Sequence, residues 1–558
     1  MAADPGGLDF VPLLLQEGMA RHRAGDLEAA QRAYEQVVEL APANADGLHL
    51  LGLVLYQRGQ PERGIELIRR AIALNPAAPA YHGNLATLLE RTDRPAEAIQ
   101  ALERAASLTV DATLLVRLAR LHRQAGNTAA AVHWVRRAAE TAPDDPAIQD
   151  AAAEALFELR DFAGAEAAGR RLVELQSDSA PGRIKLAAAL SAMERFPEAL
   201  DHLERAIQLD PAAPSPYSLK GVALLSLGEV DAAAGCFEQA LARDPDFAPA
   251  HYNFGVARLL AGDLAAGWPE YEARGASDLF QRRRGAVRQP VWNGEPVEGK
   301  RLLVEAEQGF GDAIQFVRYL PLVAERAEVL LECRPQLASL LARLPGVSRI
   351  VSVDEPLPEF DCHVPLLSLP RIFGTTLASV PANVPYLTPD PARVSAWQKR
   401  LSQYEGHKVG LTWRGSPNNP HDARRSIPPG LLAPLADVPG VQLFAVRKRE
   451  TGEPPSEDLP DLPLIDLDPL LADFDDTAAA IACLDLTISV DTSVVHLAGA
   501  LARPVWVLLP YVPDWRWLLG RADSPWYPTA RLFRQPALGA WEAAVAEVAS
   551  SLRQLTSH

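Results

Sequence analysis

The first half of the chain repeats one pattern of small and large residues every 34 positions, with a single step of 33. Each unit begins with a small residue, in turn Gly18, Gly52, Ala86, Ala119, Ala153, Ala187, Gly221 and Gly255. A later column is mostly large and apolar: Tyr34, Ile68, Leu102, Val135, Leu203, Phe237 and Tyr271. Small residues let two helices approach, and large ones fill the gap to the next unit. The pattern predicts about eight pairs of antiparallel helices over residues 11–274.

A different pattern begins at residue 301, where short apolar runs alternate with helical stretches. Residues 301–306 predict a strand, 307–312 a tight loop and 313–326 a helix. A proline-rich segment at 381–393 interrupts this series, and a second series begins with a strand at 408–413. Alternation of this kind is typical of parallel α/β architecture, so we expect two α/β domains.

The most apolar part of the second series predicts a strand, a helix and another strand, at 486–490, 494–501 and 505–509. The polar turn between the first strand and the helix consists of Asp491, Thr492 and Ser493. In a parallel sheet, ligands bind beyond the carboxyl ends of the strands, where a helix N-terminus offers N–H groups and partial positive charge. We therefore expect this turn, with His496 one helical turn further on, to bind a phosphate-bearing molecule.

Composition narrows the class of protein. The 558 residues are too many for one hydrophobic core, and the net charge of -17 argues against broad binding to nucleic acid or to anionic membranes. The 4 cysteines lie far apart without the spacing of a metal site, which favours a reduced compartment. The N-terminal residues do not form a secretion signal, and charges interrupt the most apolar window. We expect a cytoplasmic protein with no integral membrane segment and no nucleic-acid partner.

The repeated columns resemble the tetratricopeptide repeat. The resemblance implies a superhelix over residues 1–274 whose inner groove holds a protein acceptor. A spacer or an oligomerisation arm is the alternative. The O-GlcNAc transferases, which share this architecture, line the groove with asparagines, whereas this chain has only Asn84 and Asn253 in the corresponding column.

The second half resembles the heptosyltransferase-like glycosyltransferases of family 9. Its first loop and helix read EQGFGDAIQFVRYLP, and its later turn and helix read ISVDTSVVHLAGALARPVW. The segment VGLTWRGSP is similar to the transferase half of bacterial proteins that fuse tetratricopeptide repeats to this domain. The resemblance implies a GT-B fold, in which two Rossmann-like domains face a cleft. We expect a linker at 275–299, an acceptor-side domain at 300–390 and a nucleotide-sugar domain at 391–558.

The resemblance implies that Asp312, at the end of the glycine-flanked loop, is the catalytic base of an inverting transfer. The alternative is that Asp312 only caps the following helix. Glu307 on the same loop is a second candidate base, and Gly311 and Gln315 are possible contributors to the site.

The donor site is expected to combine the helix N-terminus with a basic loop. Thr492 and Ser493 would bind phosphate oxygens, and Asp491 would orient sugar hydroxyls or hold the turn. His496 would either stabilise phosphate charge or pack between helix and sheet. The loop after the strand at 408–413 supplies further candidates, with the planar arginine fork suited to phosphate: Trp413, Arg414, Gly415, Arg425 and, as possible members, Arg424 and Lys448.

Together these features predict an inverting, metal-independent transfer of a sugar from a nucleotide-sugar donor, without another cofactor, to Ser or Thr of a protein. The repeat-transferase fusion resembles flagellin-modifying enzymes, so flagellin and a nonulosonic acid are the first expectation for acceptor and sugar. The alternatives are an ADP-heptose-dependent heptosyltransferase, a UDP-GlcNAc-dependent O-GlcNAc transferase, and a scaffold with a degenerate transferase domain. The acidic clusters at 466–468 and 473–476 are not interpreted as metal ligands, and Asp475 or Asp476 is expected to cap the helix that follows.

Overall fold

The computed structural model describes residues 10–276, 287–416, 419, 422–447 and 462–556. It divides into two compact units, Met1–Pro216 and Tyr217–His558, here called the N-terminal and C-terminal units.

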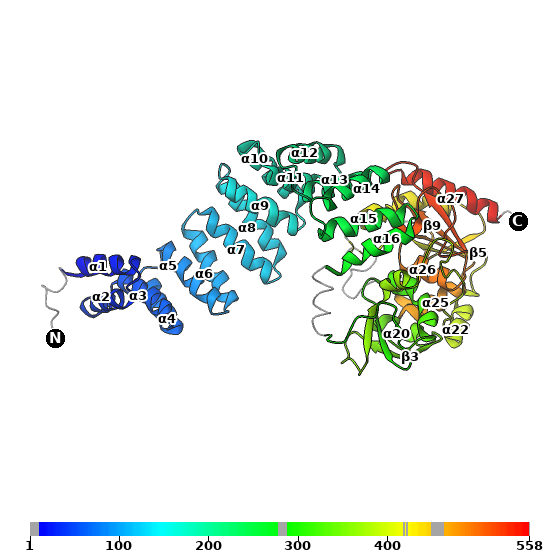
Figure 1. Cartoon of the computed structure of the whole chain (residues 1–558), viewed down its shortest axis with the longest axis horizontal. Helices are drawn as coiled ribbons and strands as arrows, with labels where there is room; N and C mark the ends of the chain where they lie inside the picture. Colours follow the sequence, from blue (N-terminus) through cyan, green and yellow to red (C-terminus); the bar gives the residue numbers. More distant parts are fainter. Residues whose placement is uncertain (1–9, 277–286, 417–418, 420–421, 448–461, 557–558) are drawn as a thin grey trace. The chain divides into compact units, whose positions relative to one another are not determined.

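A helical solenoid of about 16 helices occupies the first half, as the repeat pattern predicts (Figure 1). The helices of the N-terminal unit are α1(Val11–Arg23), α2(Leu27–Leu40), α3(Ala45–Gln57), α4(Pro61–Leu74), α5(Pro79–Arg91), α6(Pro95–Leu108), α7(Ala112–Gln124), α8(Thr128–Thr141), α9(Pro146–Glu158), α10(Phe162–Leu175), α11(Ala180–Ala192) and α12(Phe196–Leu209). The division between units falls near the start of α13(Ser215–Ser226), which is followed by α14(Val230–Leu241), α15(Ala248–Leu260), α16(Leu264–Tyr271) and the short helix η2(Glu272–Ala276).

The small-residue column works as the sequence suggests, by letting paired helices come close. A Cβ added at Gly52 would lie 2.8 Å from the backbone oxygen of Gly64 on the partner helix. A Cβ at Gly255 would lie 2.6 Å from the backbone nitrogen of Tyr271. Tyr34, in the large column, is fully buried. Close helix approach and filled gaps are therefore both specified by the columns.

Two parallel sheets form the rest of the C-terminal unit. The four-stranded sheet has the order β3-β2-β1-β4, and the six-stranded sheet has the order β10-β9-β8-β5-β6-β7. The strands are β1(Arg301–Glu305), β2(Glu328–Cys333), β3(Val347–Ser352), β4(Cys362–Pro365), β5(His407–Thr412), β6(Val441–Ala445), β7(Leu464–Asp466), β8(Leu486–Val490), β9(Val505–Leu509) and β10(Ala530–Arg534). Strands β1, β4, β8 and β9 are buried almost throughout, as suits strands that are covered on both faces, whereas the edge strands β3 and β7 are only partly buried.

Helices cover and connect these strands, and several lie at the places that the sequence predicts. They are α18(Phe310–Phe316), η3(Val317–Tyr319), α19(Leu320–Ala324), α20(Pro335–Leu341), η4(Leu366–Ser368), α21(Leu369–Ile372), α22(Pro391–Leu401), α23(Asp422–Arg425), η5(Pro429–Leu432), α24(Ala433–Ala436), η6(Asp468–Leu470), α25(Phe474–Ala482), α26(Ser493–Ala500), η7(Trp515–Trp517) and α27(Trp541–Thr556). The single helix predicted at 313–326 is instead three pieces, α18, η3 and α19, beginning at Phe310. Pro321 accounts for the last break because it has no backbone N–H to continue the helix.

The last repeat helices share a hydrophobic core with the four-stranded sheet. Phe254, Trp268 and Tyr271 belong to the same buried cluster as Val304 and Phe316. The predicted boundary at residue 274 separates these groups, whereas the compact units divide after Pro216. The repeat array thus ends inside the C-terminal unit.

Part of the predicted linker also packs against the sheet. Val291 forms a parallel bridge with His363 of β4, and the side chain of Trp292 is buried. Residues 277–286 lie outside the described part of the chain. Across the described ranges, the helices lack the combination of length and apolar character that crossing a bilayer requires.

Candidate functional site

The N-terminal ends of two short helices meet in the C-terminal unit. Helix α18 follows β1 of the four-stranded sheet, and α26 follows β8 of the six-stranded sheet. The two helices pack directly against each other. A Cβ added at Gly311 would lie 2.8 Å from Cδ2 of His496 and 3.6 Å from Cα of Ser493. Gly311 therefore permits the close approach of two elements that both follow the carboxyl ends of parallel strands, where ligands of such sheets bind.

Asp312 lies at this meeting point with its side chain 20% exposed. One carboxylate oxygen accepts a hydrogen bond of 2.9 Å from the backbone N–H of Gly309. The other oxygen pairs with the guanidinium of Arg516. The capping contact proposed as the alternative role of Asp312 is thus present, together with an ion pair to the six-stranded sheet region.

Arg516, which the sequence analysis did not select, is the cation at the centre of the site. It lies on η7 and is buried. Its side chain donates hydrogen bonds of 2.8 Å to Gln315 and of 2.8 Å to Asp514, besides the pair with Asp312. Burial opposes its charge, but Asp514 and Asp312 outweigh that effect and raise the pKa of Arg516. A permanent positive charge therefore holds the predicted base in place.

The turn that precedes α26 remains partly accessible. Thr492 is the N-cap, and its hydroxyl oxygen accepts a hydrogen bond of 3.3 Å from the N–H of Val494 and lies 3.1 Å from the hydroxyl of Ser489. Asp491, Thr492 and Ser493 are all partly exposed, whereas the helix behind them is buried. A ligand can therefore reach the helix N-terminus but not its body.

Asp491 is in an environment that disfavours its charge. Burial, followed by repulsion from Asp514, raises the pKa of Asp491 to about 6, against the opposing influence of Arg425 and Arg516. Arg425 donates a 2.8 Å hydrogen bond to the backbone oxygen of Asp491. Because its pKa is about 6, this carboxyl group gains or loses its proton close to neutral pH. Such a group is better suited to a hydrogen bond with a hydroxylated ligand than to contact with phosphate.

His496 is buried in an aromatic setting. Its Nδ1 lies 3.0 Å from the hydroxyl of Tyr527, and its ring stacks on Trp517 at 5.6 Å. Burial and the nearby cations, Arg516 first among them, lower the pKa of His496 well below its usual range. His496 is therefore neutral at physiological pH and contributes packing and a polarised edge rather than a positive charge.

The basic loop after β5 is built around Asp422. A Cβ at Gly415 would collide with the side chains of Arg425 and Asp422, so a larger residue there would displace these two side chains. Arg425 donates a 3.0 Å hydrogen bond to Asp422. Arg414 is partly buried in the same loop.

Three other members of the predicted set are placed differently. Trp413 is buried in a hydrophobic cluster with Ile427 and Leu432, so its indole supports the loop from within. Arg424 donates a 3.3 Å hydrogen bond to Ser226 of α13. Lys448 lies outside the described residues.

Glu307 and Gln315 also have structural partners. Glu307 accepts hydrogen bonds from the N–H groups of Leu366 and Leu367 and pairs with Arg274 of η2 at 3.3 Å. Burial raises the pKa of Glu307 to about 7, although Arg274 opposes the shift. These contacts tie the end of the repeat array to η4 and are separate from the α18–α26 contact. Gln315 is fully buried and accepts from Arg516.

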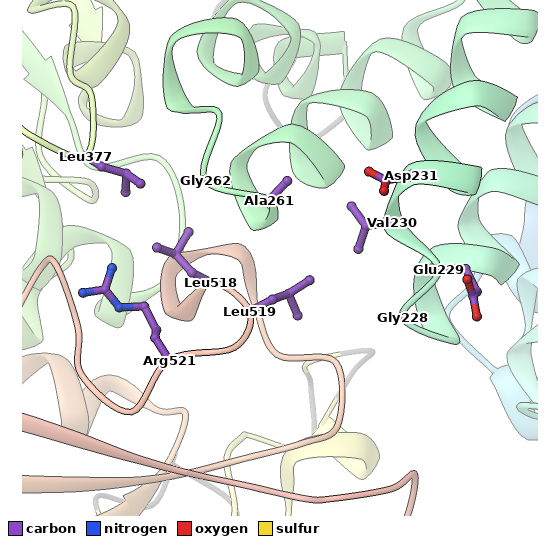
Figure 2. Close-up of a pocket in the computed structure, with 10 residues that line it drawn as sticks. All are labelled: Gly228, Glu229, Val230, Asp231, Ala261, Gly262, Leu377, Leu518, Leu519 and Arg521. Atoms are coloured by element: carbon purple, nitrogen blue, oxygen red, sulfur yellow. The ribbon is translucent and has the colours of Figure 1, made fainter.

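A separate cavity of about 550 Å³ lies within the C-terminal unit (Figure 2). It is lined by the turns at 228–231 and 261–262 of the last repeats, by Leu377, and by Leu518, Leu519 and Arg521. Its lining contains none of the predicted site residues. Leu518 has φ 53° and ψ -177°, a conformation that is almost confined to glycine and that costs roughly 1–3 kcal/mol. The segment that follows Arg516 is thus held in place by its surroundings at a cost in backbone strain.

Among the described residues, no group of three or more His, Cys, Asp or Glu side chains is gathered as a metal site would require. The absence of a metal requirement remains a prediction. The N-cap of α25 is Asp473, whose side chain accepts a hydrogen bond from the N–H of Asp476. The expectation that Asp475 or Asp476 is the cap is therefore wrong, because both lie in the first turn of the helix.

Comparison with known proteins supports the repeat array most directly. Models of the tetratricopeptide repeat match residues 15–79, 49–113, 116–182, 184–235 and 218–278. Protein FlbA of Caulobacter vibrioides is 28% identical over 68% of this chain and 74% of its own length. Because 68% of the chain is more than either compact unit contains, the aligned residues include parts of both.

Solved structures are similar to the chain only at a general level. PilF of Pseudomonas aeruginosa is 19% identical, covering 37% of this chain and 94% of its own, with a TM-score of 0.29. The Naa15/Naa10 complex bound to HypK-THB is 19% identical, covering 49% of this chain and 43% of its own, with a TM-score of 0.37. YrrB, described as a TPR protein with an unusual peptide-binding site, is 16% identical, covering 40% of this chain and 97% of its own, with a TM-score of 0.25. At these TM-scores the likenesses carry no argument about site or activity.

Proposed function

We propose that the chain is a glycosyltransferase of the GT-B type that moves a sugar from a nucleotide-sugar donor to Ser or Thr of a protein, with inversion and without a metal. The observation that carries the proposal is the meeting of α18 and α26. It brings the carboxylate of Asp312 next to a partly exposed helix N-terminus. A carboxylate opposite an anion-binding helix end is the combination that transfer from a sugar phosphate requires.

The two parallel sheets support this proposal. Each sheet presents the carboxyl end of a strand and a following helix at the same contact, β1 with α18 and β8 with α26. The buried Arg318 links the surrounding regions by donating hydrogen bonds of 2.7 Å to the backbone of Trp526 and of 3.0 Å to Tyr386. Two α/β regions whose helices meet in this way support the proposed GT-B type.

In the proposed reaction, Asp312 acts on the acceptor and the N-terminus of α26 acts on the donor phosphate. Asp312 accepts the proton of the acceptor hydroxyl, and the acceptor oxygen forms a bond to the anomeric carbon of the donor sugar. The bond between that carbon and the donor phosphate oxygen breaks, and its electron pair leaves on the phosphate. The N–H groups of α26, the hydroxyls of Thr492 and Ser493, and the guanidinium groups of Arg425 and Arg414 stabilise the developing phosphate charge. Attack opposite to the leaving group inverts the configuration.

Arg516 is a positioning residue in this scheme. Its bonds to Asp312, Gln315 and Asp514 fix the direction of the Asp312 carboxylate. Gly309 fixes the other oxygen, so the carboxylate has little freedom to rotate. Orientation of a catalytic group before the substrate binds lowers the entropic part of the barrier.

The proposed acceptor is a protein bound by the repeat array, with flagellin and a nonulosonic acid as the first candidates. The long solenoid supports a protein rather than a glycolipid, because an array of helix pairs offers an extended binding surface. An ADP-heptose donor and a UDP-GlcNAc donor are the alternatives for the sugar side. The proposed location is the cytoplasm, where nucleotide sugars are made.

A second candidate, a non-catalytic scaffold, is favoured by one specific observation. Both oxygens of Asp312 already have partners in the protein, Gly309 and Arg516. A carboxylate used in this way can join the two sheet regions without taking part in a reaction. In that case the repeat array would still bind a protein, and the C-terminal unit would bind no sugar nucleotide.

Nucleotide binding distinguishes the two candidates. Thermal unfolding of the full chain is followed by tryptophan fluorescence in the presence of CMP, UDP, ADP or GDP, each at millimolar concentration. Trp134 is the only tryptophan before residue 217, so the signal reports mainly on the C-terminal unit. The transferase proposal predicts a higher midpoint with one nucleotide, because a ligand that binds only the folded state stabilises it. No shift with any of the four would favour the scaffold.

A further inference from the structure

Tyr252 of α15 is an exposed aromatic side chain of the repeat array, on a helix that packs against η7. Its residue is 37% exposed, and its ring stacks on Tyr271 of α16 at 5.6 Å and 29°. Tyr271 in turn makes an edge contact of 5.7 Å with Trp515. The guanidinium of Arg516 lies 4.3 Å above the ring of Trp515. A continuous series of rings therefore leads from the exposed Tyr252 to the cation that holds Asp312.

Packing between elements agrees with this path. Helix α15 contacts η7, which carries Trp515 and Arg516. Burial raises the pKa of Tyr252, and Tyr271, Asp514 and Asp312 add to the rise, whereas Arg516 opposes it. The phenol thus stays protonated and lies within reach of the same charges that surround the predicted base. Tyr252 therefore combines partial exposure with a helix that packs against η7, the element that carries the partner of Asp312, Arg516.

We propose that Tyr252 is the acceptor-side platform of the site: its exposed ring packs against the polypeptide segment that flanks the glycosylated Ser or Thr. This inference rests on the proposed function and adds the class of acceptor that the site recognises. A tyrosine ring is flat and rigid, with an apolar face and a polar edge, so its exposed part can pack against a peptide backbone. Because the ring comes from the repeat array, the platform joins acceptor recruitment to the site of transfer.

The rigidity of the Tyr252 ring also indicates which kind of acceptor segment binds to it. Tyr271 is buried beneath Tyr252 and supports its ring, so the platform is a fixed surface rather than a mobile side chain. A fixed aromatic face favours an extended segment with small residues beside the acceptor hydroxyl, because bulky neighbours would hold the hydroxyl away from Asp312. A surface-exposed loop of a folded protein, or a flexible segment, fits this requirement.

The test compares Tyr252→Ala, Tyr252→Leu and Tyr252→Phe in the full chain, with purified flagellin as the acceptor probe. The donor is the activated sugar of whichever nucleotide stabilises the wild-type chain. Tyr252→Ala is expected to raise the KM for flagellin by roughly tenfold or more, since a central aromatic contact is worth about that factor. Tyr252→Phe keeps the ring and is expected to stay within about twofold of wild type. If Tyr252 contacts only the acceptor, the KM for the donor stays unchanged, whereas contact with the sugar would raise that KM as well.

Tyr511→Ala is the matched control, because Tyr511 is 40% exposed and lies against Gly228. Tyr252→Leu keeps apolar volume without a ring and replaces Tyr252→Ala should that variant unfold at a lower temperature. An unchanged KM for flagellin in both Tyr252→Ala and Tyr252→Leu would overturn the inference, and so would an equal rise in the KM for the donor. Absence of transfer by the wild-type chain would instead overturn the proposed function and, with it, this inference.

Discussion

The two compact units differ in their arginines: both have exposed ion pairs, but the C-terminal unit also buries several arginines. In the N-terminal unit, arginines pair with carboxylates on the surface: the side chains of Arg170 and Glu198 are 41% and 44% exposed. In the C-terminal unit, Arg516, Arg274 and Arg318 are buried. Exposed pairs contribute little to stability, whereas a buried arginine is costly unless carboxylates and carbonyl oxygens surround it. Buried arginines are therefore expected where a charge must be held at a fixed place.

That difference is consistent with the proposed reaction taking place in the C-terminal unit. The N-terminal unit can exchange its surface pairs without losing its helix packing, which depends on the small and large columns. The C-terminal unit holds Arg516 between Asp312, Asp514 and Gln315, so removing Arg516 takes a hydrogen-bond partner from all three. Perturbed pKa values also gather there, at Asp491, His496 and Arg516. Such clustering is typical of functional sites.

The largest effect is expected from Arg516→Met. The variant leaves Asp312 and Asp514 without their shared cation, and we expect the C-terminal unit to lose about 3–5 kcal/mol of unfolding free energy. Urea unfolding followed by tryptophan fluorescence measures this loss. Arg516→Lys should recover part of it, because an ammonium group keeps the charge but not the planar fork. If Arg516→Met lost no more unfolding free energy than a variant that removes a surface arginine, the contrast between the two units would be wrong.

Asp491→Asn is expected to change how the stability of the C-terminal unit depends on pH. The pKa of Asp491 is raised from 3.8 to about 6 in the folded chain, so the wild type loses stability as pH rises through that range. The variant avoids the loss and should be more stable than wild type at pH 7.5, by up to about 3 kcal/mol. The two proteins should converge near pH 3.5. Urea midpoints at both pH values test this, with the exposed Asp354→Asn as a control. A constant difference between the two pH values would contradict the account.

Gly255→Ala tests the packing of the last helix pair. The new methyl group would lie 2.6 Å from the backbone nitrogen of Tyr271, which cannot move without shifting α16. We expect a loss of about 1–3 kcal/mol, measured by calorimetry. Gly83→Ala in α5 is the contrasting variant, because no atom lies within 4 Å of its added Cβ. Its unfolding free energy should rise by about 0.5–1 kcal/mol because alanine has the higher helix propensity. A fall would contradict the view that glycine is needed only in the small-residue column.

The smallest effect is expected from Arg136→Ala in the N-terminal unit. Arg136 makes two hydrogen bonds to Asp161, of 2.5 and 2.6 Å, but its side chain is 52% exposed. Solvent screens such a pair, so the loss should not exceed about 1 kcal/mol. Thermal unfolding followed by circular dichroism at 222 nm measures it. A loss comparable to that of Arg516→Met would mean that surface pairs hold the array together.

The repeat half could be predicted in detail because its information is local. Each helix pair is specified by columns twelve to sixteen residues apart, as Gly18, Ala30 and Tyr34 show. The strands at 486–490 and 505–509 were predicted at their observed bounds, since short buried runs between turn residues are also local signals.

The central contacts of the site could not be predicted in this way. Asp312 and Arg516 are 204 positions apart, and no period or spacing links them. Arg516 was not among the predicted site residues, although an arginine two positions after Asp514 and between two tryptophans is a polar signal in an apolar run. Tyr252 was missed for the same reason, because its partners become neighbours only through the fold.

The most direct test of the central claim is the intact mass of purified flagellin after incubation with the chain and a panel of activated sugars. Wild type is expected to add the mass of at least one sugar with one donor. Asp312→Asn keeps the shape and can still accept the hydrogen bond from Gly309, but it should transfer at least 100-fold more slowly, because an amide cannot take the proton. An equal mass gain with wild type and Asp312→Asn, or no gain with any donor, would contradict the claim that this site transfers a sugar.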